Sequence, residues 1–428
     1  MIRAFSVVAA MSVSFTLAAQ SVAITGGTVV TGDGQRIANA TVVISGGRIQ
    51  AVGAGLAAPA GAQVIDARGK FIYPGLINSR TTLGLTEISS VSGGEDDSEQ
   101  GDWGPAFASI VAVNPHSELI PVTRVNGVTT VLSGPTGGRI AGMAALMDLD
   151  GWTPTEMART ALAALVVTWP QLEAGGGGGG FGGGGFGGGG GGALTPEQIR
   201  QRGERQVWEL GEYIRSARSY HERAARGQMP PRDRHLEAMG PVVRGEVPML
   251  VTANTADQIR SALAFADSLQ VRLIIGGGRQ AWRVAAELAQ ANVPVILGSI
   301  LSSPGQDPFD AIYAQPAVLA RAGVRIAFAS WDASNARNLP YHAQMAVAHG
   351  LSPDTALMAM TSWPAAMWGV SDDIGTIAVG KVANLFIATG DPIDVRTQVE
   401  AVFIRGRAIS MESRHTILYE RFRARPRN

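Results

Sequence analysis

Side chains able to act as nucleophiles, acid–base groups or metal ligands are few in this 428-residue chain. It has no cysteine, which excludes disulfides, thiolate zinc sites and cysteine nucleophiles. Lysine occurs only as Lys70 and Lys381, so the region between them offers no amine for Schiff-base chemistry. None of the histidines lies at the C-terminal end of a predicted strand, and we interpret them as ordinary surface or core residues rather than a metal site: His116, His221, His235, His342, His349 and His415.

Two kinds of sequence pattern predict the strands and helices that would position a functional site. Short runs of Val, Ile and Thr between glycine turns fill residues 21–72 and return at 384–388 and 401–405, which is typical of antiparallel strands. Between them, strand-like runs alternate with helical ones, which predicts parallel β/α units. The strand-like runs are 76–78, 129–132, 164–168, 249–253, 272–275, 293–297 and 325–328. We expect an α/β fold, a (β/α)8 TIM barrel with its site at the C-terminal strand ends, beside a small β-sandwich.

The predicted boundaries follow these patterns. Residues 1–19 read as a signal peptide, because Arg3 precedes an apolar run that ends at the small residues Ala18 and Ala19. The β-sandwich takes residues 20–72 and 371–413, the barrel takes 73–370, and 414–428 form a C-terminal tail. We expect a bacterial protein exported to the periplasm or secreted, with no membrane span after signal removal, since the apolar run is shorter than the ~20 residues of a span.

One segment lies outside any predicted core. Residues 175–192 are glycine except for Phe181 and Phe186, and so many glycines predict a mobile loop within the barrel. It is either a lid with two aromatic tips or a tolerated insertion, and we favour the insertion. A helix is predicted to begin directly afterwards, where Thr195, Pro196 and Gln198 form a capping-box pattern.

Charge suggests no electrostatic partner. The chain has 35 basic and 35 acidic residues, so its formal net charge is zero. The arginines between 200 and 234 alternate with glutamates, which indicates a solvated helix face rather than a nucleic-acid surface. We expect no binding to nucleic acid.

Three stretches resemble a known family. Residues 73–84, Tyr-Pro-Gly-Leu-Ile-Asn-Ser-Arg-Thr-Thr-Leu-Gly, resemble the first barrel strand of the amidohydrolase superfamily, in which two histidines one residue apart hold a divalent metal. Residues 114–131 resemble the second barrel unit of its imidazolonepropionase-like and prolidase-like branch. Residues 375–385 resemble the turn into the C-terminal sandwich, with Asn384 where the family has aspartate. The resemblance implies the barrel-and-sandwich fold and a lineage activity of metal-assisted carbon–nitrogen bond hydrolysis.

The resemblance also implies that the metal ligands are substituted here. Arg80 and Thr82 stand at the two histidines of the first strand, and neither is a competent ligand, since arginine has no free lone pair. Thr252 and Asn254 take the aligned places of a further histidine, and Gly276 stands where another would end the next strand. We therefore expect no cofactor, although zinc or another divalent metal serves the family.

The strand-eight aspartate, which relays a proton in the family, is retained as Asp332. Because strand eight adjoins strand one in a closed barrel, we hypothesise that Arg80 replaces the lost cation and pairs with Asp332. Arg337 is a second candidate for binding an anionic group at the mouth, and a structural role capping its loop is an equal alternative. The predicted pocket thus comprises Arg80, Thr82, Thr252, Asn254, Gly276 and Arg337.

These observations leave three functions open. The chain is an amidohydrolase-like enzyme whose catalysis is weak or absent, a non-catalytic protein that binds ligand or pairs with an active paralogue, or a metal-free hydrolase with Asp332 as base. We expect a small amide or peptide-like ligand. Assembly as a homo-oligomer, or as a hetero-oligomer with the paralogue, is compatible with each.

Overall fold

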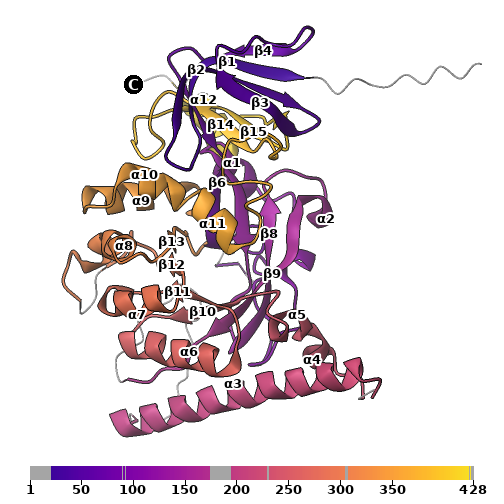
Figure 1. The fold of residues 1–428 in the computed structure, drawn as a ribbon, viewed down its shortest axis with the longest axis vertical. Coiled ribbons are helices and arrows are strands. Elements are labelled where there is room, and N and C mark those ends of the chain that lie inside the picture. The colour runs from indigo at the N-terminus through magenta and orange to yellow at the C-terminus, as the bar shows by residue number, and fades with distance from the viewer. Residues whose placement is uncertain are drawn as a thin grey trace, which may run out of the picture.

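The computed structural model describes residues 21–88, 90–91, 93–173, 194–228, 231–303, 307–423 and 425. The predicted signal peptide and the glycine-rich segment 175–192 lie outside these residues. The described chain forms two eight-stranded sheets, one built from both ends of the chain and one from its middle (Figure 1). None of the helices in the described ranges is long and apolar enough to span a membrane.

The first sheet joins the two ends of the chain. Its main path runs β16–β15–β14–β5–β1–β2–β3, and β4 pairs with β1. The strand β5 from the N-terminal part pairs antiparallel with β14 from the C-terminal part, which is how distant segments share one sheet. The strands are β1 (Val22–Val30), β2 (Arg36–Ser45), β3 (Arg48–Ala54), β4 (Gln63–Asp66), β5 (Phe71–Pro74), β14 (Leu385–Ala388), β15 (Val399–Ile404) and β16 (Arg407–Ala408).

The second sheet curls into a nearly closed barrel, which confirms the predicted fold class. Its order is β13–β12–β11–β10–β9–β8–β7–β6, and each strand contributes a side chain to one buried apolar cluster inside the barrel. The strands are β6 (Leu76–Thr81), β7 (Val128–Ser133), β8 (Ile140–Asp148), β9 (Ala158–Thr168), β10 (Met249–Ala253), β11 (Leu273–Gly277), β12 (Val295–Leu297) and β13 (Ile326–Ala327).

The strand that the sequence left unassigned is β8, and it runs antiparallel to both neighbours. Every one of its nine residues is buried, so it shows no alternation of polar and apolar residues that would mark a strand. It links β7 to β9 without the usual helical crossover. As a result, the segment between β7 and β8 lies at the barrel mouth and becomes part of the cavity wall.

Hydrogen bonds close the barrel between β6 and the segment after β13. The Ser79 N–H donates to the Phe328 carbonyl at 3.2 Å, and the Trp331 N–H donates to the Arg80 carbonyl at 2.9 Å. Asn78 and Ser330 add two side-chain hydrogen bonds. Strands one and eight therefore adjoin, as predicted.

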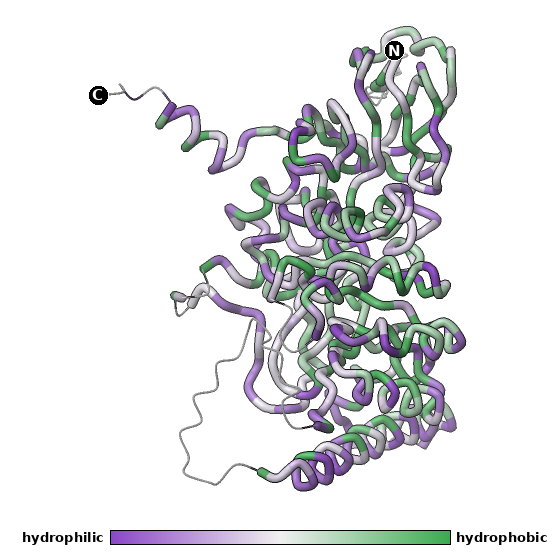
Figure 2. The backbone as a smooth tube through the Cα atoms, turned by 90° about the vertical axis from the view of Figure 1, so that its left-hand side faces the viewer, coloured by the Kyte–Doolittle hydropathy of each residue, from purple (hydrophilic) through white to green (hydrophobic). Residues whose placement is uncertain are grey.

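Helices cover the outside of the barrel (Figure 1). The longest, α3, begins at the predicted capping box of Thr195 and Gln198 and lies along the end of the molecule opposite the first sheet, with many hydrophilic residues on its outer side (Figure 2). The α-helices are α1 (Leu119–Arg124), α2 (Pro154–Met157), α3 (Pro196–Ala225), α4 (Arg234–Ala238), α5 (Gly240–Val243), α6 (Ala256–Leu269), α7 (Ala285–Gln290), α8 (Ala311–Arg321), α9 (Leu339–Ala348), α10 (Pro353–Met358), α11 (Ser362–Met367) and α12 (Arg414–Arg423). Short 3-10 helices are η1 (Ser109–Val111), η2 (Ala281–Val284) and η3 (Ala336–Asn338).

Candidate functional site

A cavity of about 290 Å³ lies at the C-terminal ends of the barrel strands. Its wall comes from the ends of β6, β9, β10 and β11, the start of β8, and the segments after β7, β12 and β13. This is the face on which barrels of this architecture place their binding and catalytic groups. Of the predicted pocket residues, Arg80, Thr252 and Asn254 border it.

Arg80 is the charged side chain buried most deeply in this wall, with 3% of its surface exposed. Its Nη1 donates to the carbonyl oxygens of Thr81 at 2.7 Å and Gly134 at 2.9 Å, and its Nη2 donates to that of Pro135 at 2.6 Å. Its Nε has no hydrogen-bond partner among the described residues. Burial lowers the pKa of Arg80 to about 10, against a smaller opposing effect of Asp97, so the guanidinium is still charged at neutral pH.

The hypothesised ion pair between Arg80 and Asp332 is not formed. The Asp332 carboxylate instead accepts hydrogen bonds from the backbone N–H of Asn335 at 2.7 Å and from its Nδ2 at 3.2 Å. Ala327 and Ala329 belong to the barrel-interior cluster and Trp331 packs against it, whereas the Asp332 carboxylate bonds the turn that follows. The two residues are neighbours through their backbones, but their side chains diverge, and Asp332 does not border the cavity.

Trp331 occupies the middle of the site. Its backbone has φ 68°, a left-handed conformation that is strained for a bulky residue. The indole N–H donates to the Leu297 carbonyl at 2.7 Å, and the Arg80 Cζ lies 5.9 Å from the ring centroid. A Cβ added to Gly276 would lie 3.0 Å from Trp331 Cη2. Gly276 therefore leaves room for the indole. Because the indole covers Gly276, this glycine does not border the cavity.

Two further predicted pocket residues also lie outside the wall. Thr82 sits in the turn after β6, where its carbonyl accepts from the N–H groups of Leu85 and Thr86. Arg337 lies in η3, where its carbonyl accepts from Asn126 Nδ2 at 3.1 Å. Burial, and then the charges of Arg337 and Arg414, lower the pKa of His415 in α12. The structure thus places Arg337 toward the C-terminal helix rather than at the mouth.

The described cavity wall contains no aspartate, glutamate, histidine or cysteine side chain. Across the described ranges, no group of three or more such residues could hold a metal ion. A catalytic zinc takes three protein ligands, so the side chains of this wall do not fit a divalent metal. What they offer is two arginines, the buried Arg80 and the more exposed Arg279, together with neutral hydrogen-bonding groups and an apolar surface.

Several residues of the wall escaped sequence reasoning, among them Arg279 and Gln315. Arg279 follows a glycine run in which Gly277 and Gly278 have φ of 80° and 58°, and this run turns the chain at the end of β11. This glycine run is visible in the sequence and could have indicated that the next residue, Arg279, lies at the barrel mouth. Gln315 lies inside α8, where no local pattern marks it.

Asp332→Asn should lower the free energy of unfolding by less than about 1 kcal/mol, because an asparagine oxygen can still accept from the Asn335 N–H. Asp332→Ala removes that acceptor and should cost about 1–2 kcal/mol. Denaturant unfolding of the two variants measures the difference. Equal losses would contradict a capping role for this carboxylate.

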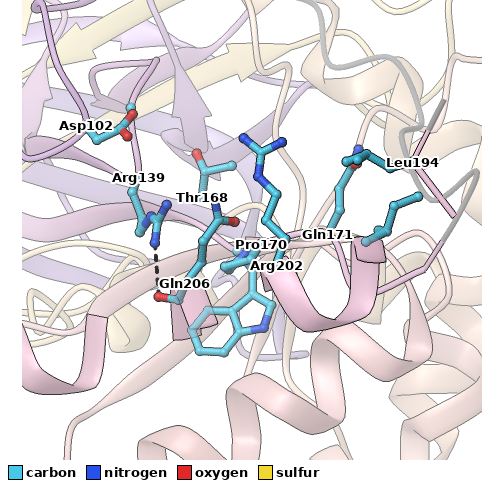
Figure 3. A pocket seen from close by; sticks show the side chains of 11 residues that line it. Asp102, Arg139, Thr168, Pro170, Gln171, Leu194, Arg202 and Gln206 are labelled. Atoms are coloured by element: carbon cyan, nitrogen blue, oxygen red, sulfur yellow. Dashed lines mark hydrogen bonds between the residues drawn. The ribbon is translucent and has the colours of Figure 1, made fainter. Parts of the chain in front are cut away.

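A second cavity, of about 390 Å³, shares Thr168 with the first. Figure 3 shows Arg139 and Gln206 in its wall, joined by a hydrogen bond of 3.0 Å from Arg139 Nη1 to the Gln206 carbonyl. The same Nη1 lies 3.2 Å from a carboxylate oxygen of Glu209. Among the described residues, this arginine has an acidic partner and Arg80 has none.

The helix α3 reaches the second cavity by close backbone contact at Gly203, where an added Cβ would lie 2.2 Å from the Gln171 carbonyl oxygen. Gly203→Ala should therefore destabilise the protein by about 1–3 kcal/mol, although alanine is normally the better helix former. Gly211→Ala in the same helix is the matched control. An added Cβ would lie 3.3 Å from the flexible Arg215 side chain and in ordinary contact, at 3.5 Å, with Phe265, so we expect no loss and up to about 1 kcal/mol gain. Stabilisation of both variants in urea unfolding would contradict the close contact.

Comparisons with known proteins agree with this architecture. Residues 311–409 match the model of the Amidohydrolase family. No curated protein matches the chain. Among solved structures, an amidohydrolase from Thermotoga maritima MSB8 is similar with a TM-score of 0.77 at 22% identity, covering 91% of this chain and 99% of that one.

Two more distant structures share the fold. Phenylurea hydrolase B is similar with a TM-score of 0.55 at 17% identity, covering 92% of this chain and 97% of that one. A prolidase complexed with n-methylphosphonate-l-proline has a TM-score of 0.53 at 16% identity, covering 91% of this chain and 99% of that one.

Proposed function

We propose that this chain is a member of the amidohydrolase superfamily and that it binds a small amide- or peptide-like molecule at its barrel mouth without metal-assisted hydrolysis. The family match and the shared fold support the lineage. Hydrolysis of carbon–nitrogen bonds is the activity of that lineage. The chemistry of this particular cavity supports retention of binding rather than of the metal-dependent reaction.

One observation carries the proposal, namely the composition of the cavity wall. Hydrolysis at neutral pH needs a metal ion or a general base beside the attacking water. The described wall supplies neither, because its polar side chains are arginine, threonine, serine, asparagine, glutamine and the Trp331 indole. Asp332, the retained carboxylate, is engaged with Asn335 outside the cavity. These groups can hold a ligand but offer no route to activate water.

The class of ligand is supported by two considerations. The wall combines apolar side chains such as Val166 and Ile312 with neutral donors and acceptors such as Thr252 and Asn254, a mixture that suits an amide attached to an apolar group. Among structures of the same fold, one is a prolidase with a proline-based phosphonate bound. A peptide-like ligand is therefore the first class to try.

The test combines metal analysis with a hydrolase screen. The purified mature protein is exposed to zinc, manganese and nickel, and elemental analysis measures the metal that remains after dialysis. The same samples are incubated with N-acetyl amino acid amides, dipeptides and cyclic amides. We expect substoichiometric metal and no metal-dependent turnover. Near-stoichiometric metal together with metal-dependent hydrolysis would overturn the proposal.

A further inference from the structure

We infer that the ligand carries a carboxylate, which the Arg80 guanidinium binds beside the Trp331 indole. This inference rests on the proposed function and names the chemical class of its ligand. Two observations carry it: Arg80 leaves some of its hydrogen-bond donors unused, and none of the described residues is an acidic partner for it.

The hydrogen-bond count of Arg80 leaves donors free. A guanidinium has five N–H donors, and the carbonyl oxygens of Thr81, Gly134 and Pro135 take three of them. The remaining two are the Nε–H, which has no partner among the described residues, and one hydrogen on Nη2. Nε–H and an Nη2–H can lie side by side on one edge of the planar group. That edge matches the two oxygens of a carboxylate.

The charge of Arg80 is also uncompensated, in contrast with other poorly exposed arginines. The Arg159 side chain is 9% exposed and pairs with Asp148 at 2.7 Å, and the Arg139 side chain is 10% exposed and pairs with Glu209 at 3.2 Å. Within the described ranges, Arg80 forms no such pair. The acid that acts on it electrostatically is Asp97, whose carboxylate is held by Thr136 Oγ1 at 3.1 Å.

A buried charge without a counter-ion is costly, and carbonyl dipoles compensate it only in part. Since the cavity wall that Arg80 borders has no acidic side chain, an anionic ligand would supply the missing charge. Trp331 bounds the same space and gives an apolar face beside the cation. Asn254 and Thr252 lie on the β10 side of the cavity, where they can bond an amide. The expected ligand is an N-acylated apolar amino acid or a small peptide with a free carboxylate.

The experiment compares matched charged and neutral probes on the full mature chain. Isothermal titration calorimetry measures binding of N-acetyl-L-leucine, N-acetyl-L-phenylalanine and N-acetyl-L-proline, each beside its carboxamide. We expect each acid that binds to bind at least about tenfold more tightly than its amide, because a charge-assisted bidentate contact replaces a neutral one. Arg80→Gln should abolish that preference, whereas Arg337→Gln, outside the cavity, should retain it.

The outcomes separate the inference from the proposed function. Equal binding of acids and amides by the wild-type protein would overturn carboxylate recognition while leaving ligand binding intact. A preference that survives in folded Arg80→Gln would overturn the role of Arg80. Absence of binding across all six probes would count against both proposals. If Arg80→Gln does not fold, the wild-type comparison and the milder Arg80→Lys variant, which keeps the charge but loses the bidentate edge, still decide the matter.

Discussion

Replacing Asp148 with alanine should lower the free energy of unfolding by about 3–5 kcal/mol. The side chain at the end of β8 is fully buried. It accepts hydrogen bonds from Arg159 Nη2 at 2.7 Å, Arg405 Nε at 2.8 Å, Thr130 Oγ1 at 2.9 Å and Asn384 Nδ2 at 3.0 Å. Its removal leaves buried donors without an acceptor and deprives two arginines of their close carboxylate partner. Because Arg405 and Asn384 flank strands of the first sheet, the loss should also loosen the contact between the two sheets.

Urea unfolding followed by circular dichroism measures this effect. The matched control is Asp150→Ala, two residues away, whose partly exposed carboxylate pairs with Arg407 and lies 3.6 Å from Arg124. A pair with access to water contributes little, so we expect a loss within about 1 kcal/mol. Equal losses of unfolding free energy for the two variants would show that the burial of Asp148 does not determine its contribution to stability.

The same network explains why residue 384 is asparagine. Its Nδ2 donates to Asp148 and to Thr130, while its Oδ1 accepts from the Arg405 N–H at 2.8 Å. An aspartate here would keep the acceptor but lose the donor, and it would set a second carboxylate against a buried one. An asparagine at this position therefore suits the buried Asp148 better than an aspartate would.

Replacing Trp331 with glycine should give a more stable protein than replacing it with alanine, by roughly 1 kcal/mol. Both variants lose the packing of a half-buried indole over Gly276, which should cost about 2–4 kcal/mol. Only alanine retains the strain of φ 68°, since the left-handed region costs an L-residue roughly 1–2 kcal/mol and glycine almost nothing. This reverses the usual ranking of the two residues. Thermal and urea unfolding of both variants test it, and a more stable alanine variant would contradict the strained backbone.

The Trp331 variants should also weaken binding of N-acetyl-L-leucine by at least about tenfold, because the apolar wall beside Arg80 disappears. This loss of affinity should be compared with the preference of the same variants for the acid probe over its amide. That preference depends on Arg80, which both variants retain, so it should persist while affinity for both probes falls. Unchanged affinity would place the ligand elsewhere.

Much of the architecture could be predicted from sequence. The capping box at Thr195 and Gln198 and the strands over 249–253 and 164–168 were each evident from local pattern, and they appear as the start of α3, as β10 and as part of β9. The strand β8 was not evident. Its residues are buried on both faces, so hydrophobic periodicity could not distinguish it from a buried helix.

By itself, the sequence determined which chemical groups stand near the barrel mouth: Arg80, Thr252 and Asn254 lie at or just after predicted strand ends, the chain has no cysteine, and no lysine lies between Lys70 and Lys381. Only the tertiary structure decided how they face. Trp331 packs against the barrel-interior cluster while the Asp332 carboxylate bonds Asn335 outside the cavity, and three carbonyl groups rather than a carboxylate accept the hydrogen bonds of Arg80. Such outcomes depend on backbone torsions and on groups brought from distant segments, and neither is encoded in the spacing of residues along the chain.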